Sequence, residues 1–131
     1  MASQAQLDML RTDVDAWNFW RAKNPKAEID LRDADLNGTD LRLAHLQGAD
    51  LRGATLVLAQ LTGADLHGAN LRGANLVGAR LIGADIEGCD LRGADLRTAE
   101  DLTREQLLST RGDAETVLPD LVERPSHWSG G

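Results

Sequence analysis

The chain has 131 residues, including 13 glycines, one phenylalanine and no tyrosine, so it is long enough for one domain, and that domain cannot have a core built from aromatic rings. The formal net charge of -7 argues against nucleic acid or an anionic membrane as the main partner. A single cysteine excludes an intrachain disulfide, and no aliphatic run approaches the roughly 20 residues of a membrane-spanning helix. We therefore expect a cytoplasmic protein that binds no nucleic acid directly and is not attached to a membrane.

Residues 1–28 predict an N-terminal helical cap. Within them, residues 3–23 predict one amphipathic helix closed by Pro25, with an apolar stripe of Leu7, Leu10, Val14 and Trp17. Capping-box spacing at its start is provided by Ser3 and Gln6. Three of the four aromatic residues gather near its end, at Trp17, Phe19 and Trp20. We expect them to plug the open end of the following segment, and an aromatic anchor for a partner is the alternative.

Residues 29–98 repeat with a period of five. All fourteen central positions from Leu31 to Leu96 are leucine, except for Ile86. Alanine stands two positions before the central residue of nearly every repeat, with Ile29, Thr39 and Cys89 as departures, and glycine recurs two positions after the central residue. This period fits neither a helix of 3.6 residues per turn nor the two-residue alternation of a strand. The chain must therefore turn a corner every five residues, with the aliphatic and small residues inside and glycine at the corners.

Residues 99–131 predict a C-terminal helix and an extended tail. Thr103 and Gln106 have capping-box spacing, so we expect a short helix over 103–111 that covers the last coil and stops at Gly112. The prolines that follow favour an extended tail. Its apolar residues are expected to lie against the wall of the coil: Val117, Leu118, Leu121, Val122 and Trp128.

Stretches such as Ala64–Gly68 (ADLHG) and Ala69–Gly73 (ANLRG) resemble the A(D/N)LXX unit of the pentapeptide repeat proteins. The resemblance covers residues 29–98. It implies an all-β solenoid, a right-handed quadrilateral β-helix with four pentapeptides per coil, hence about three and a half coils, in a protein of bacterial type. Helical caps at both ends are expected, because an open end exposes apolar core and unpaired amides.

No pattern of catalytic residues stands out, so the sequence predicts a protein that is not an enzyme and needs no cofactor or metal. His45, His67 and His127 lack metal-ligand spacing and are expected in solvent. Cys89 occupies an inward small-residue position, which predicts a buried thiol without nucleophilic function.

Two sets of outward residues are candidates for protein binding. Coils of twenty residues align Arg32, Arg52, Arg72 and Arg92 in one column beside a parallel column of Asp30, Asp50, Asn70 and Asp90. These columns predict either a self-neutralised face in solvent or a docking strip for an acidic partner. The second set is an apolar spot of Val57, Leu58 and Val77. We expect the C-terminal tail to cover this spot, with a protein interface, including a homodimer, and plain exposure as alternatives.

Together these features predict a non-catalytic protein-protein interaction or scaffold module whose partner is unknown. The alternative is a DNA mimic that modulates a gyrase-type topoisomerase, as the quinolone-resistance branch of the resembled family implies. The short stack and the arginine column stand against this alternative.

Overall fold

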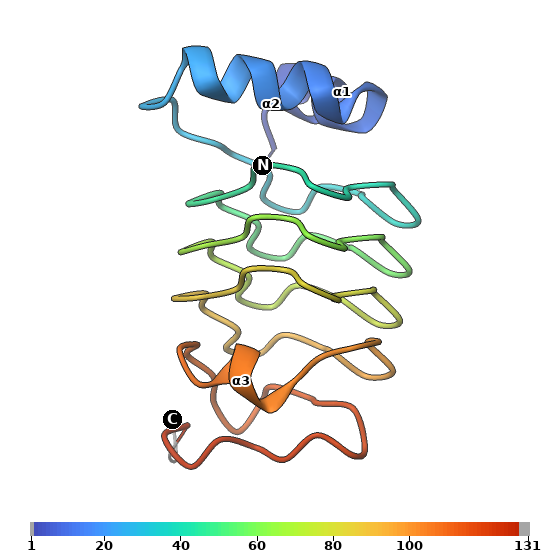
Figure 1. The fold of residues 1–131 in the computed structure, drawn as a ribbon, viewed down its shortest axis with the longest axis vertical. Coiled ribbons are helices and arrows are strands. Elements are labelled where there is room, and N and C mark those ends of the chain that lie inside the picture. The colour runs from blue at the N-terminus through green and yellow to red at the C-terminus, as the bar shows by residue number, and fades with distance from the viewer. Residues whose placement is uncertain (1, 129–131) are drawn as a thin grey trace.

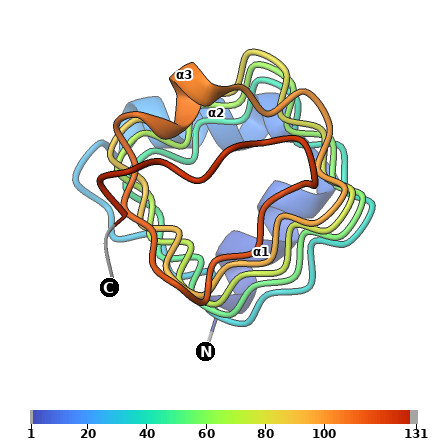
Figure 2. The ribbon, with the colours of Figure 1, turned by 90° about the horizontal axis from the view of Figure 1, so that it is seen from below.

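The structure is a computed structural model that describes residues 2–128 of the chain. Parallel backbone bridges join residues twenty positions apart in a series from Asp30 with Asp50 to Arg80 with Glu100. Each of these bridged residues except Glu100 directly precedes a central leucine or Ile86, so successive coils stack with their repeats in register. Figures 1 and 2 show the coils stacked along one axis and nearly superimposed when seen along it.

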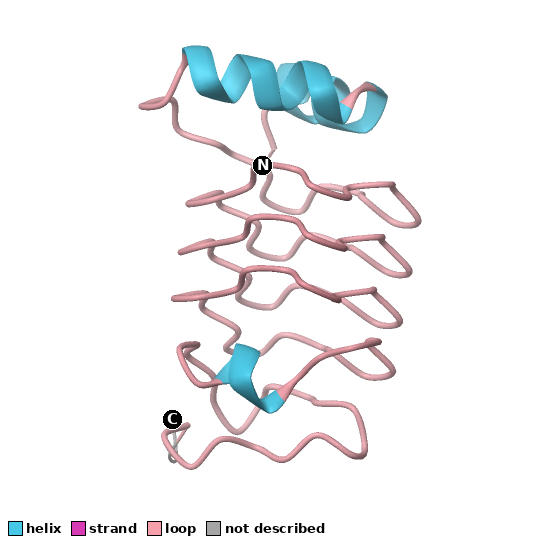
Figure 3. Cartoon of the chain, viewed as in Figure 1, coloured by secondary structure: helices cyan, strands magenta, loops and turns pink. Residues whose placement is uncertain are grey.

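The bridges are isolated and do not extend into continuous strands within the described residues. Figure 3 accordingly shows the coils as loops between the helices. The reason is the five-residue period, which leaves one bridged residue between successive two-residue turns. The β content that the sequence predicted is therefore present as a ladder of single bridged residues.

One hydrogen-bond pattern recurs in the repeats, and the repeat of Leu51 illustrates it. The amide of Leu51 donates to the carbonyl of Asn70 at 2.8 Å, and the amide of Gly53 donates to that of Arg72 at 2.9 Å. The amide of Ala54 donates back to the carbonyl of Leu51 at 3.0 Å. The first two bonds join neighbouring coils and the third closes the corner.

The corners require a left-handed backbone. All fourteen corner positions from residue 33 to residue 98 have φ between 56° and 72°. Ten of them are glycine, as expected, since any other residue pays roughly 1–2 kcal/mol there. The four exceptions are Asp33, Leu43, Leu58 and Thr98.

The interior of the coil is a ladder of aliphatic side chains. The central leucines and Ile86 are at most 3% exposed, and Cys89 is fully buried among the small residues beside them. This confirms the inward assignment of both sets of positions.

The N-terminal segment forms two helices, α1 (Gln4–Thr12) and α2 (Val14–Lys23), where the sequence predicted one. Asp13 separates them with an extended backbone at φ -158° and ψ 106°. Its amide donates to the carbonyl of Met9, and its side chain accepts from the amide of Ala16. The single-helix prediction was wrong because aspartate is a strong capping residue, and here it ends one helix and begins the next.

Both helices lie across the first coil (Figure 1). Trp17 is fully buried there, and its indole Nε1 donates to the carbonyl of His45 at 2.9 Å. Arg21 is also buried and donates to the carbonyls of His45 and Gln47 at 3.1 and 3.0 Å. Phe19 points outward with 67% of its surface exposed. The expected aromatic plug is therefore only partly present, and Arg21 completes it.

The C-terminal helix, α3 (Arg104–Leu107), is shorter than predicted. Its capping box between Thr103 and Gln106 is present. The side chain of Gln106 also donates to the carbonyls of Leu81 and Ala84, at 3.0 Å each. Gln106 thereby ties the helix to the end of the stack.

The bridge ladder resumes after α3. Arg111 bridges to Asp90, and Val117 bridges to Asp95. The stack therefore continues past residue 98, where the sequence predicted its end. The C-terminal segment thus forms part of a further coil as well as an end cap.

The tail lies across the end of the stack (Figures 1 and 2). Trp128 is 4% exposed, and its Nε1 donates to the carbonyl of Thr110 at 3.2 Å. Leu58 on the wall remains 66% exposed. The prediction that the tail covers Val57, Leu58 and Val77 was wrong, because Leu118, Val122 and Trp128 pack against the core at the end of the stack. Val117 and Leu121, which were also expected against the wall, are exposed.

Candidate protein-binding surface

The arginine column is held by a repeated Asp-x-Arg unit. In three of its four members, the guanidinium donates from Nε and Nη2 to both oxygens of the aspartate two positions earlier, at 2.6 to 2.9 Å; these pairs are Asp30 with Arg32, Asp50 with Arg52 and Asp90 with Arg92. The same aspartates accept the backbone amide of their arginine at 3.2 or 3.3 Å. Most of this face is therefore self-neutralised, as one of the two alternatives from the sequence predicted.

The pairs also shift the ionisation of the carboxylates. The hydrogen bond from Arg32 lowers the pKa of Asp30 to about 2, and the bond from Arg42 lowers that of Asp40 to about 2. Because these pKa values are lowered in the folded protein, the pairs stabilise it above about pH 4, and this contribution is lost as pH falls towards 2.

The sequence analysis missed two further pairs of the same kind, Asp40 with Arg42 and Asp95 with Arg97. Their signal was available, because both follow the same two-residue spacing.

Arg72 is the exception in the column. Asn70 takes the place of the aspartate and accepts the backbone amide of Arg72 at 3.1 Å. Among residues 2–128, no carboxylate oxygen lies within 4.0 Å of the Arg72 guanidinium. The fourth guanidinium of the column is thus open to solvent beside Arg52 and Arg92.

The apolar spot is exposed at its centre. Leu58 has a left-handed backbone with φ 59°, and its side chain lies over Gly78 on the next coil. Val57 and Val77 beside it are half-buried. These three residues lie together on the outside of two neighbouring coils, as the twenty-residue spacing of Val57 and Val77 predicted.

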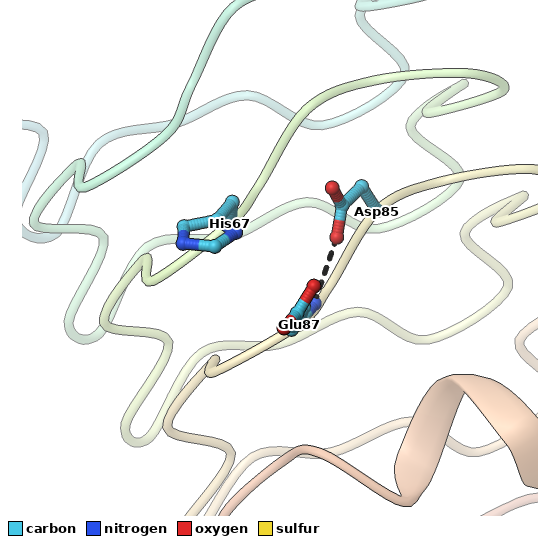
Figure 4. A group of neighbouring side chains, drawn as sticks. All are labelled: His67, Asp85 and Glu87. Carbon is cyan, nitrogen blue, oxygen red and sulfur yellow. Dashed lines mark hydrogen bonds between the residues drawn. The ribbon is translucent and has the colours of Figure 1, made fainter.

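Another face of the coil is acidic, and on it the side chains of His67, Asp85 and Glu87 form a cluster that the sequence did not indicate as a set of ligands. Ligand atoms of His67, Asp85 and Glu87 lie within 4.8 Å of one another, and all three side chains are exposed. Figure 4 shows them, with the amide of Glu87 donating to Asp85 at 3.0 Å. Their spacing in the coil was the missed signal, since Glu87 follows His67 by twenty residues. Three exposed side chains do not by themselves define a cation site.

Cys89 is not a candidate nucleophile. Its Sγ donates to the carbonyl of Leu66 at 2.9 Å, and burial raises the pKa of its thiol to about 12. It therefore stays protonated near neutral pH.

The repeats match a known family over most of the coil. The family model for pentapeptide repeats, which comprises eight copies of the repeat, matches residues 27–59 and 59–97. The chain belongs to the pentapeptide repeat family. The crystal structure of the pentapeptide repeat protein alr5209 from Nostoc Pcc 7120 is 34% identical, with a TM-score of 0.55, over 73% of this chain and 70% of that chain.

Two further solved structures are similar to this pentapeptide repeat protein. Rfr23 from the cyanobacterium Cyanothece 51142 is 36% identical over 71% of this chain and 67% of its own, with a TM-score of 0.39. QnrB1, a plasmid-mediated fluoroquinolone resistance protein, is 14% identical over 76% of this chain and 75% of its own, with a TM-score of 0.41. A comparison with curated proteins gives no match. Within the described part of the chain, no helix has both the length and the apolar character to cross a membrane.

Proposed function

We propose that this pentapeptide repeat protein is a non-catalytic interaction or scaffold module, in which a right-handed quadrilateral β-helix with closed ends presents its outer faces to another protein. The observation that carries the proposal is the distribution of side chains in the coil. Leucine and alanine fill the interior, so the charged and polar side chains of the coil stand outside in regularly spaced columns. Such an array suits recognition by a partner surface.

The architecture supports binding in a second way. Each repeat is tied to its neighbours by backbone hydrogen bonds, so the outer columns are held in fixed register. A rigid surface loses little conformational entropy when it binds a partner. The candidate contacts are Val57, Leu58, Val77 and the column of Arg32, Arg52, Arg72 and Arg92. A cytoplasmic location and a homodimer through the apolar spot are part of this proposal.

The second candidate function is a DNA mimic that modulates a gyrase-type topoisomerase. The acidic face around Asp65, Asp85 and Glu87 and the net charge of -7 favour it. The Asp-x-Arg pairs weigh against it, because they neutralise another face of the same short stack. We therefore rank it second.

The test is capture of a protein from the native cytoplasm on the immobilised full-length chain, followed by calorimetric titration of the two purified proteins. We expect saturable binding that excess free chain competes away. The variant Val57→Arg with Val77→Arg tests the apolar spot, and light scattering of the same variant tests the homodimer. The absence of any competed protein, together with a monomeric wild-type chain, would contradict the interaction function.

A further inference from the structure

We propose that Arg72 and Asn70 form a binding site for a carboxylate side chain on an acidic segment of a partner protein. This inference rests on the proposed interaction function and names the chemistry of its partner. Arg72 is the one member of the arginine column that follows an asparagine and not an aspartate.

The rule is chemical as well as geometric. In each complete Asp-x-Arg unit, both carboxylate oxygens accept from the guanidinium, and one of them also accepts the backbone amide of the arginine. Asn70 reproduces the amide contact through its single carbonyl oxygen, at 3.1 Å from the Arg72 nitrogen. The other end of its side chain is an NH2 group, which donates and cannot accept from a guanidinium. Asn70 therefore keeps the turn but lacks the second oxygen that accepts from Nη2 in the complete units, and among the described residues no hydrogen bond joins its side chain to the Arg72 guanidinium.

Arg72 lies between two column arginines whose guanidinium groups are already paired. Arg52, Arg72 and Arg92 are consecutive in the column, and only Asp50 and Asp90 pair with them. They line a shallow hollow of about 480 Å³ whose floor includes Gly73 and Gly93. An incoming carboxylate can reach Arg72 over these glycines without meeting a side chain from them.

Two acidic residues also line this hollow, and neither supplies the missing acceptor. The carboxylate of Asp113 accepts the amides of Gly93, Glu115 and Thr116, at 2.9 to 3.1 Å. Glu115 has no cationic nitrogen within 4.0 Å among the described residues. The acceptor for Arg72 is therefore left to another molecule.

The geometry favours a carboxylate on a protein. A guanidinium fork matches the two oxygens of a carboxylate, and a donor amide beside it adds a third donor. The hollow is too open to enclose a small ligand, whereas a protein segment brings surrounding surface that excludes water from the pair. The complement of this positive position is an acidic segment.

The test is an NMR titration of the isotope-labelled full-length chain with an acetylated, amidated hexaglutamate peptide. We expect saturable shifts of the Arg72 Nε–H and Asn70 NH2 signals, several-fold larger than those of Arg52 and Arg92, whose forks are already filled. Asn70→Asp fills the Arg72 fork from within and is expected to weaken binding about fivefold or more. This variant places at position 70 the residue that positions 30, 50 and 90 already carry, so its fold is expected to be retained and is checked by circular dichroism.

Arg42→Gln is the matched control, because Arg42 is paired with Asp40 on another face and its loss is expected to leave hexaglutamate binding unchanged. Equal shifts at all column arginines, or equal binding by Asn70→Asp, would overturn the proposal in favour of unspecific charge attraction. Tighter binding of a phosphoserine hexapeptide, or of inorganic phosphate, would overturn its assignment to a carboxylate.

The same variants separate this proposal from the proposed function. If a captured protein binds the wild-type chain and Asn70→Asp equally well, the interaction function stands and the Arg72 site is wrong. If no protein is captured, the interaction function fails, while the hexaglutamate titration still decides whether Arg72 and Asn70 bind carboxylates.

Discussion

At the scale of single residues, the position within the pentapeptide decides the chemistry of a side chain. An aspartate before the central leucine is outside, where it accepts hydrogen bonds from an arginine two positions later. A cysteine in the small-residue position is inside, where burial raises its pKa. The same residue type would behave differently one position away in the repeat.

Cys89 makes the stability of the protein dependent on alkaline pH. Burial raises the pKa of its thiol to about 12 in the folded state, whereas an unfolded thiol ionises near about 8.5. This contribution is therefore complete below about pH 8.5 and is lost as pH rises towards 12. We expect the free energy of unfolding, measured with urea, to fall by about 2 kcal/mol more between pH 7.5 and 10 in the wild type than in Cys89→Ala.

The absence of tyrosine removes one group that ordinarily titrates in the same range. Equal losses of stability in the wild type and in Cys89→Ala would show that the thiol is not the cause.

Gly112 is expected to be intolerant of any side chain. A Cβ at this position would overlap the ring of Trp128, which lies against the glycine backbone. Gly112→Ala should lower the thermal stability by about 1–3 kcal/mol, as overpacking does. In a Trp128→Ala background the same change should cost little, and a full cost in both backgrounds would contradict the contact.

At the scale of elements, the two ends of the coil are closed by different means. The N-terminal helices place Trp17 and Arg21 over the first coil, where both donate to backbone carbonyls that lack a further coil. The C-terminal segment instead resumes the ladder at Arg111 and Val117. One end is covered by helices, and the other by a partial coil and a tail.

Trp17 is expected to hold the N-terminal cap. It is fully buried, so Trp17→Ala should cost about 3–5 kcal/mol and promote association through the uncovered first coil. Phe19→Ala is the matched control on the same helix, because Phe19 is 67% exposed, and it should cost less than about 1 kcal/mol. Thermal unfolding and size-exclusion chromatography of both variants provide the measurements. Similar losses in the two variants would contradict the plug.

At the scale of the whole molecule, charge is distributed unevenly. The net charge is -7, yet residues 29–98 hold ten acidic and seven basic residues, a balance of only -3. Three of the acidic residues, Asp65, Asp85 and Glu87, share one face, whereas the arginine column lies on another. The coil therefore does not present a continuous negative surface.

This distribution predicts little or no effect on DNA gyrase. A DNA mimic needs a long, uniformly negative surface, and this stack carries paired arginines over much of one face. We expect no more than weak inhibition in a supercoiling assay at about micromolar concentration, because the stack lacks that surface. Potent inhibition would place the gyrase function first.

The sequence by itself determined the coil, its inward ladder and its columns. A strict five-residue period forces each side chain to a fixed place, so Leu31 through Leu96 and Arg32 through Arg92 could be assigned without coordinates. The glycine corners followed from the same period, because a corner every five residues needs unusual backbone angles that glycine adopts most readily. For the same reason, the outward positions of the arginine column and of the apolar spot could be predicted.

Only the tertiary structure decided what happens where the period ends. The burial of Arg21 depends on which carbonyls the first coil leaves unpaired, and no local pattern reports those. The tail covers the end of the stack and not the apolar spot on its side. The end of the last coil has both apolar surface and backbone groups that need hydrogen-bond partners. The lack of a carboxylate near the Arg72 guanidinium was likewise visible only in the structure. The sequence places Asn70 beside Arg72, but it does not say which other acceptors lie within hydrogen-bond distance of Arg72.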